Sequence, residues 1–64
     1  MDKKELEYLK NEYVGKNITI VSLEGEPNYS GKTGIVKYVD DIGQLHGSWG
    51  GLAVQPEHDD FRVV

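Results

Sequence analysis

The chain has 64 residues, which leaves room for one hydrophobic core and no second domain. It contains no cysteine, which excludes disulfides and zinc-thiolate sites, and its seven basic and eleven acidic residues give a net charge of −4. This charge works against affinity for a phosphate backbone. The N-terminal residues are rich in charge and contain no apolar run, so we predict a cytoplasmic protein with neither a signal peptide nor a membrane span.

The N-terminal segment has the pattern of a short helix. Asp2 is a suitable N-cap residue, and Gly15 can end the helix in a left-handed conformation. Between them, Leu6, Leu9 and Tyr13 recur at helical spacing and form one narrow apolar stripe. A helix with so thin a stripe is not stable alone. We therefore predict a helix over residues 1–13 that covers one end or seam of the domain that follows.

From residue 14 onward, short runs rich in β-branched residues alternate with turn residues. Five strands are predicted, over Asn17–Leu23, Thr33–Val39, Gln44–Trp49, Leu52–Val54 and Phe61–Val64. The connections are a long loop over residues 24–32, hairpin turns at 40–43 and at Gly50-Gly51, and a segment over 55–60 that can form a 3₁₀ turn. This order is typical of SH3-like barrels. The predicted fold class is mainly β, a single domain over 1–64 with the helix over 1–13 and a small five-stranded SH3-like barrel over 14–64.

Several motifs of the chain recur together in one family. They are Val14-Gly15-Lys16, Gly31-Lys32-Thr33-Gly34-Ile35-Val36, Val39-Asp40-Asp41-Ile42-Gly43-Gln44-Leu45-His46, Trp49 and Leu52-Ala53-Val54. Over residues 13–64 the chain thereby resembles the bacterial domain of unknown function 4314. The resemblance implies an SH3-like fold and a setting among small bacterial and mobile-element proteins, but no activity, substrate or cofactor. One departure from the family pattern is Gly47, where an apolar residue is usual.

Two polar clusters could carry chemistry. The adjacent carboxylates of Asp40 and Asp41 could bind a hard cation. However, an aspartate at the start of a hairpin turn accepts hydrogen bonds from the following amides, and Gly43 can supply a positive φ, so we interpret the segment as a turn. The second cluster, Glu57-His58-Asp59-Asp60 with His46, lacks the spacing of a metal site. The sequence therefore predicts a protein without catalytic residues, metal or cofactor.

Aromatic and acidic residues in two connections suggest a binding face. We hypothesise that the loop at 24–32 and the turn at 40–43 rise around one groove that binds a protein or peptide, preferably a basic one. The candidate ligand-binding residues are Tyr29, Tyr38, Glu24, Glu26, Asp40 and Asp41. Trp49 is instead interpreted as a core residue packed over the glycine turn.

Two other functions stay open at this point. A nucleic-acid-binding barrel of the KOW type would use the basic residues Lys16, Lys32, Lys37 and Arg62, although the acidic net charge makes a nucleic-acid partner the less favoured one. A metal-dependent enzyme would use His46 and His58. No membrane partner is expected, and the chain is predicted to be a monomer or a weak homodimer that pairs free strand edges.

Overall fold

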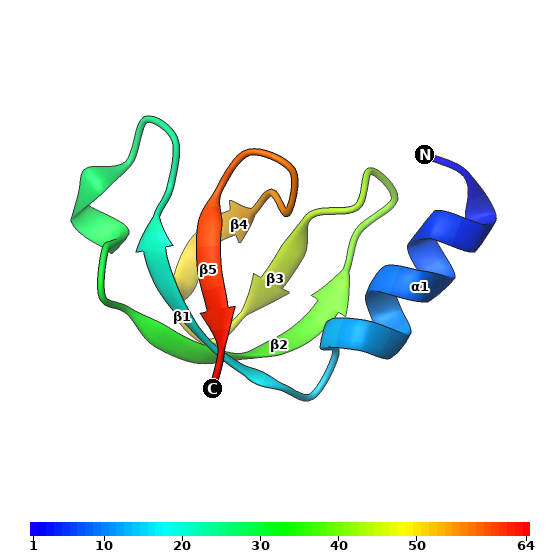
Figure 1. Ribbon diagram of the computed structural model, residues 1–64, viewed down its shortest axis with the longest axis horizontal. Coiled ribbons are helices and arrows are strands. Elements are labelled where there is room, and N and C mark those ends of the chain that lie inside the picture. The colour runs from blue at the N-terminus through cyan, green and yellow to red at the C-terminus, as the bar shows by residue number, and fades with distance from the viewer.

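The computed structural model describes residues 1–64 as one α-helix, one 3₁₀ helix and five strands (Figure 1). The elements are α1 (Lys3–Tyr13), β1 (Asn17–Ser22), η1 (Pro27–Tyr29), β2 (Thr33–Val39), β3 (Leu45–Gly47), β4 (Gly50–Val54) and β5 (Asp60–Val63). The strands form one antiparallel sheet in the order β4-β3-β2-β1-β5. The predicted helix and all five predicted strands are therefore present, with strand ends shifted by up to two residues.

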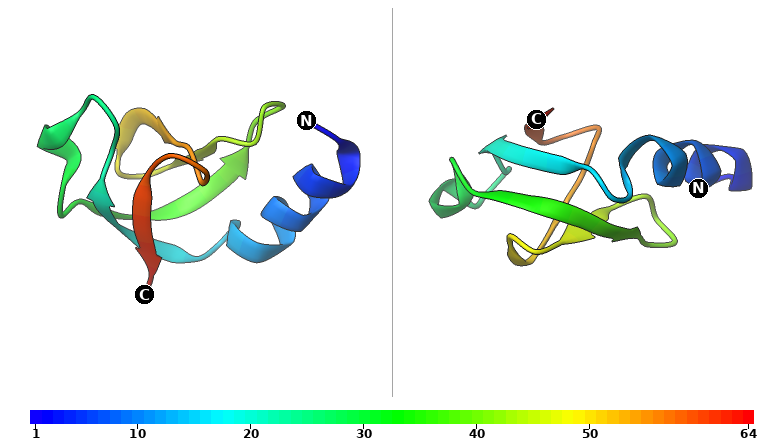
Figure 2. Two further views of the ribbon diagram at one scale, coloured as in Figure 1. Left: turned by 45° about the horizontal axis from the view of Figure 1, so that its top comes forward. Right: turned by 90° about the horizontal axis from the view of Figure 1, so that it is seen from below.

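The sheet coils into two layers because β2 belongs to both (Figure 2). Its first half, Thr33 to Ile35, pairs with β1, and its second half, Val36 to Val39, pairs with β3. The end strands β4 and β5 are not hydrogen-bonded to each other. The mainly β, five-stranded fold is confirmed, and the barrel is an open one.

The core lies between the two layers and is entirely apolar. Eight side chains are buried: Ile18, Ile20, Leu23, Val36, Val39, Leu45, Trp49 and Val54. No polar or charged residue is buried with them. Ile18 and Ile20 on β1, like Gly34 and Val36 on β2, are buried with the period of two expected of half-buried strands, and a register shift after Val36 turns Val39 inward as well.

Helix α1 lies at one end of the coiled sheet (Figure 1). The Asp2 carboxylate accepts a hydrogen bond from the Lys4 amide at 2.7 Å and caps the first turn. The stripe of Leu6, Leu9 and Tyr13 packs against the core, as its spacing predicted. The chain then leaves the helix through Gly15, whose φ is +88°. No helix here has both the length and the apolar character needed to cross a membrane.

The connections differ in two details from the prediction. A 3₁₀ helix lies at Pro27–Tyr29 in the first loop, in addition to the turn predicted after Val54, in which the Gln55 carbonyl accepts from the amides of His58 and Asp59. The tip of the last hairpin lies at Ser48-Trp49, because Gly47 pairs with Gly50 and the following glycines belong to β4.

Candidate functional site

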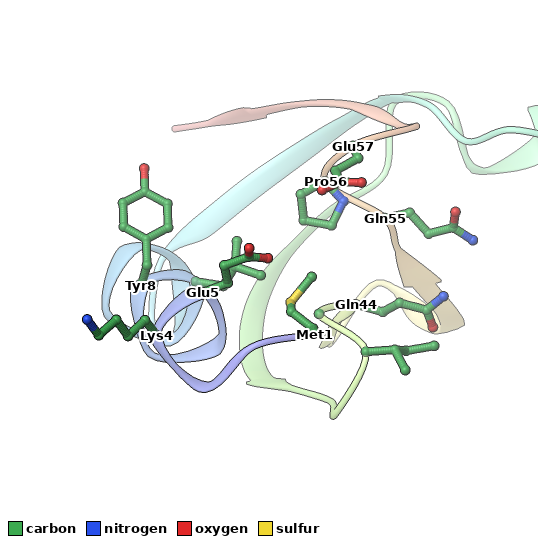
Figure 3. Close-up of a pocket in the computed structure, with 11 residues that line it drawn as sticks. Met1, Lys4, Glu5, Tyr8, Gln44, Gln55, Pro56 and Glu57 are labelled. Atoms are coloured by element: carbon green, nitrogen blue, oxygen red, sulfur yellow. The ribbon is translucent and has the colours of Figure 1, made fainter.

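A groove separates α1 from the two connections nearest to it (Figure 3). Its volume is about 430 Å³. The lining comes from the start of α1, the β2–β3 turn and the β4–β5 loop, through Met1, Lys4, Glu5, Tyr8, Leu9, Ile42, Gly43, Gln44, Gln55, Pro56 and Glu57. Segments from the beginning, middle and end of the chain thus meet at one concave surface.

Three apolar side chains in this groove remain largely open to solvent. The exposed fractions are 52% for Met1, 61% for Tyr8 and 65% for Ile42. Met1 lies in the middle of the groove (Figure 3), where its side chain packs on Gly43. A Cβ atom at Gly43 would overlap the end of the Met1 side chain. A glycine is favoured there by its φ of +81°, whereas the flexible end of the exposed Met1 side chain can move aside.

Charged residues border the apolar part of the groove. Glu5 and Lys4 lie on the α1 side, and Glu57 lies on the opposite side next to Pro56 (Figure 3). None of these side chains is in a salt bridge, since the chain's one such pair is His46 with Asp40. The groove therefore carries two unpaired carboxylates, the unpaired Lys4 ammonium group and the α-ammonium group of Met1.

The Asp40 carboxylate organises the β2–β3 turn. Its Oδ1 accepts hydrogen bonds from the amides of Ile42 at 3.1 Å and Gln44 at 2.9 Å, and its Oδ2 lies 2.7 Å from Nε2 of His46. Partial burial by itself would raise the pKa of Asp40, but the His46 bond and the two amides outweigh it and hold the pKa below its ordinary value. The predicted role of Asp40 as a turn residue is confirmed.

Replacing Asp40 with alanine is expected to destabilise the domain by about 1–2 kcal/mol at neutral pH, because the variant loses a cap for two turn amides. Asp40→Asn keeps one acceptor oxygen and should lose less. A carboxyl whose folded pKa is lowered contributes stability above its unfolded pKa, and this contribution disappears as the pH falls through the folded pKa. Urea unfolding of wild type and D40A at several pH values should therefore give curves that converge in acid, and a constant difference would contradict this role.

An aromatic pair lies on the outer side of the same hairpin. The rings of Tyr38 and His46 stack with centroids 4.5 Å apart and planes within 1° of parallel. These residues face each other in the β2–β3 register. Tyr38 keeps 55% of its surface exposed. The predicted site residues Tyr38, Asp40 and Asp41 therefore lie on one hairpin.

The other half of the predicted site lies elsewhere. Glu24, Glu26 and Tyr29 belong to the β1–β2 loop, at the end of the molecule opposite to the β2–β3 turn (Figure 1). The six steps from Thr33 to Val39 along β2 separate the two connections by about 20 Å. The two segments do not enclose a common groove, because the strand that joins them also holds them apart.

Tyr29 is not the free aromatic residue that the sequence suggested. It is half-buried and packs against the core, and its ring lies over Gly50, where an added Cβ atom would come within 3.0 Å of the phenol oxygen. The Lys32 ammonium group stands 5.2 Å from the ring centre. Tyr29 thus joins the first loop to the start of β4, which is a structural role.

The polar residues of the second predicted cluster also separate. Asp59 bonds two backbone amides, that of Glu24 at 2.8 Å and that of Gln55 at 2.7 Å, and so ties the β4–β5 loop to the end of β1. His58 is exposed in that loop, whereas His46 is engaged with Asp40. No group of three or more potential metal-ligating side chains is assembled.

The four basic residues considered for nucleic-acid binding are spread over the fold. Lys16 precedes β1 at one end, and Lys32 lies at the other end, where its carbonyl accepts from the Ile20 amide. Lys37 is on β2. Arg62 is on β5, where it pairs with Thr19 of β1. The fold therefore does not gather them into one cluster.

Sequence reasoning missed the residues that line the groove. Two signals were available: Tyr8 lies off the apolar stripe of the helix, and Ile42 is an apolar residue in an otherwise polar turn. The Tyr38–His46 pair could also have been predicted. In a hairpin, residues equally far from the centre of the turn face each other, and both residues are four positions from Ile42. Only the structure shows that Tyr8 and Ile42 line the same groove and that the Tyr38 ring stacks on His46.

Comparisons with known proteins give the chain a family. No curated protein and no solved structure matches it. Residues 2–64, almost the whole chain, match the family described as domain of unknown function (DUF4314). This agrees with the resemblance carried by the motifs around Gly34, Asp40 and Trp49. The chain therefore belongs to the DUF4314 family.

Proposed function

We propose that this protein is a non-enzymatic interaction module whose groove beside α1 binds a protein segment that presents an apolar side chain next to a basic one. One observation carries the proposal: three largely exposed apolar side chains, Met1, Tyr8 and Ile42, converge on one groove of about 430 Å³. This volume lies in the range of ligand sites, about 300–1,000 Å³. Single exposed apolar residues are common on protein surfaces, whereas a concave cluster of them favours a binding role.

The charge of the molecule favours a basic partner. Glu5 and Glu57 border the groove, Lys4 and the α-ammonium group of Met1 are the cations there, and the chain as a whole carries −4. Exposed carboxylates at the rim steer a cationic ligand and disfavour a polyanion. The proposed binding face thus still contains carboxylates, as predicted from the sequence, but they lie at a different place.

The absence of catalytic activity is part of the proposal. His46 is the half-buried histidine, and it hydrogen-bonds to Asp40 with no serine or threonine hydroxyl bonded to it. The Ser48 hydroxyl accepts from the Ile35 amide at 2.9 Å. These contacts support a structural use of the side chains that a hydrolytic mechanism would need.

The test is an NMR and calorimetric titration with acetylated, amidated hexapeptides that contain one leucine and one lysine or arginine. Binding should shift the amides of the groove, and matched peptides with glutamate in place of the basic residue should bind more weakly. Ile42→Ser should reduce affinity about tenfold or more, because burying an isoleucine side chain contributes about 2 kcal/mol. Val64→Ser is the control, since Val64 is similarly exposed (70%) but lies outside the groove.

A second pair of variants tests the location of the charge. Glu57→Lys and Glu24→Lys change the net charge equally, but only Glu57 lines the groove. Glu57→Lys should weaken binding of the basic peptides severalfold, and Glu24→Lys should leave it near the wild-type value. Equal effects of the two variants would contradict the groove. Shifts caused by short oligonucleotides around Lys16, Lys37 and Arg62, with none caused by the peptides, would replace the proposal with nucleic-acid binding.

A further inference from the structure

The outer side of the β2–β3 hairpin carries an aromatic surface that the groove does not use. One face of the Tyr38 ring is covered by His46, with centroids 4.5 Å apart, and 55% of the Tyr38 surface remains exposed. A tyrosine stacked on one side and open on the other presents a flat aromatic face to solvent. Tyr38 is not part of the core cluster, so the fold does not require an aromatic ring there.

The pair is held in a fixed arrangement by the same carboxylate that builds the groove wall. Asp40 Oδ2 lies 2.7 Å from His46 Nε2, which fixes the imidazole under Tyr38. Asp40 Oδ1 accepts from the amides of Ile42 and Gln44, two residues that line the groove. The aromatic face and the groove are therefore the two sides of one turn, and both are organised before a ligand arrives.

The charges on the β2–β3 hairpin select the ligand of the aromatic face. Asp41 is exposed and makes no hydrogen bond or salt bridge from its side chain. Strands β3 and β4 contribute no charged residue except His46, if it is protonated, and the nearest cation in the sequence is Lys37 on β2. The Asp40 carboxylate is already bonded to His46 and to two amides, so Asp41 is the free carboxylate of this turn. Its charge disfavours a phosphate-bearing base and favours a cation over the ring.

We propose that the open face of Tyr38 is an arginine-binding site, in which an arginine of the segment bound in the groove lays its guanidinium group on the Tyr38 ring and donates hydrogen bonds to Asp41. The site rests on the proposed function, since the same segment occupies both sides of the turn. Arginine fits better than lysine because its guanidinium group is planar, more weakly hydrated and able to stack while it donates in its own plane.

The experiment compares hexapeptides that carry one leucine and, one to four residues away, either arginine or lysine. At the best spacing the arginine peptide should bind about two- to fivefold more tightly than its lysine counterpart, the range expected for a cation on an exposed aromatic face. Tyr38→Ala should remove this preference, and Tyr38→Phe should restore it because the ring is kept. Tyr8→Ala changes a similarly exposed tyrosine inside the groove, so it should weaken both peptides equally and leave the preference unchanged.

These variants separate the arginine site from the groove. If both peptides bind equally to wild type while Ile42→Ser weakens both, the groove stands and the arginine site is wrong. If neither peptide binds, N-acetylarginine amide and N-acetyllysine amide are titrated directly at high millimolar concentration. If the NMR chemical shifts of the Tyr38 ring and the Asp41 amide change with the arginine probe but not with the lysine probe, the result supports the arginine site independently of the groove. The absence of such shifts would overturn it.

Discussion

Trp49→Ala is expected to destabilise the domain by about 3–5 kcal/mol, the usual cost of removing a large buried aromatic side chain. Trp49 is 4% exposed in the apolar core, and its indole Nε1 donates to the Leu52 carbonyl at 2.7 Å. A domain of this size has a total stability of roughly 3–10 kcal/mol. We therefore expect the variant to be partly or wholly unfolded at room temperature, as measured by urea unfolding followed by circular dichroism.

Two controls show which part of Trp49 matters. Trp49→Phe keeps most of the ring but leaves the Leu52 carbonyl without its donor, so it should cost less than the alanine variant and more than a surface change. Tyr38→Ala removes an exposed aromatic residue and should alter stability by about 0.5 kcal/mol or less. If Trp49→Ala melts within a few degrees of wild type, the burial of this side chain does not hold the fold together.

Gly47→Ala is expected to cost about 1–3 kcal/mol or more through overpacking. A Cβ atom at this position would lie 2.8 Å from Cη2 of Trp49 and would overlap the carbonyl oxygen of Ile35. That oxygen cannot retreat freely, because it accepts from the Ser48 amide while the Ser48 hydroxyl accepts from the Ile35 amide. The Trp49 ring therefore fills the space that a larger side chain at Gly47 would need.

Gly51→Ala is the matched control for Gly47→Ala. Both glycines lie in the β3–β4 hairpin, but a Cβ atom at Gly51 would meet nothing within 4 Å. This change should leave stability unaltered or raise it by up to about 1 kcal/mol, since alanine loses less conformational entropy on folding. Thermal unfolding should then show a lower midpoint for Gly47→Ala alone, by roughly 4–8 °C for each kcal/mol. Equal midpoints would mean that the hairpin adjusts to the added methyl group.

The proposed binding surfaces were only partly visible in the sequence. The interpretation of Asp40 as a turn residue followed from its position before Asp41-Ile42-Gly43, because its bonds to the two turn amides span four residues or fewer. The grouping of Tyr29 with Tyr38 failed because it required two distant connections to meet. Tyr29 packs against Gly50 instead, a contact that no local sequence pattern predicts.

The sequence by itself determined the elements of this protein, because capping, the helical spacing of Leu6, Leu9 and Tyr13, strand alternation and the turn at Gly43 all act over a few neighbouring residues. It also placed Trp49 in the core, which the structure bears out. Only the tertiary structure decided where α1 lies against the sheet, and hence that Met1, Tyr8 and Ile42 share a groove. It likewise decided the tip of the last hairpin, where burial of Trp49 outweighed the turn preference of Gly50-Gly51. Such long-range packing depends on the shape of the whole core, which short-range sequence patterns do not encode.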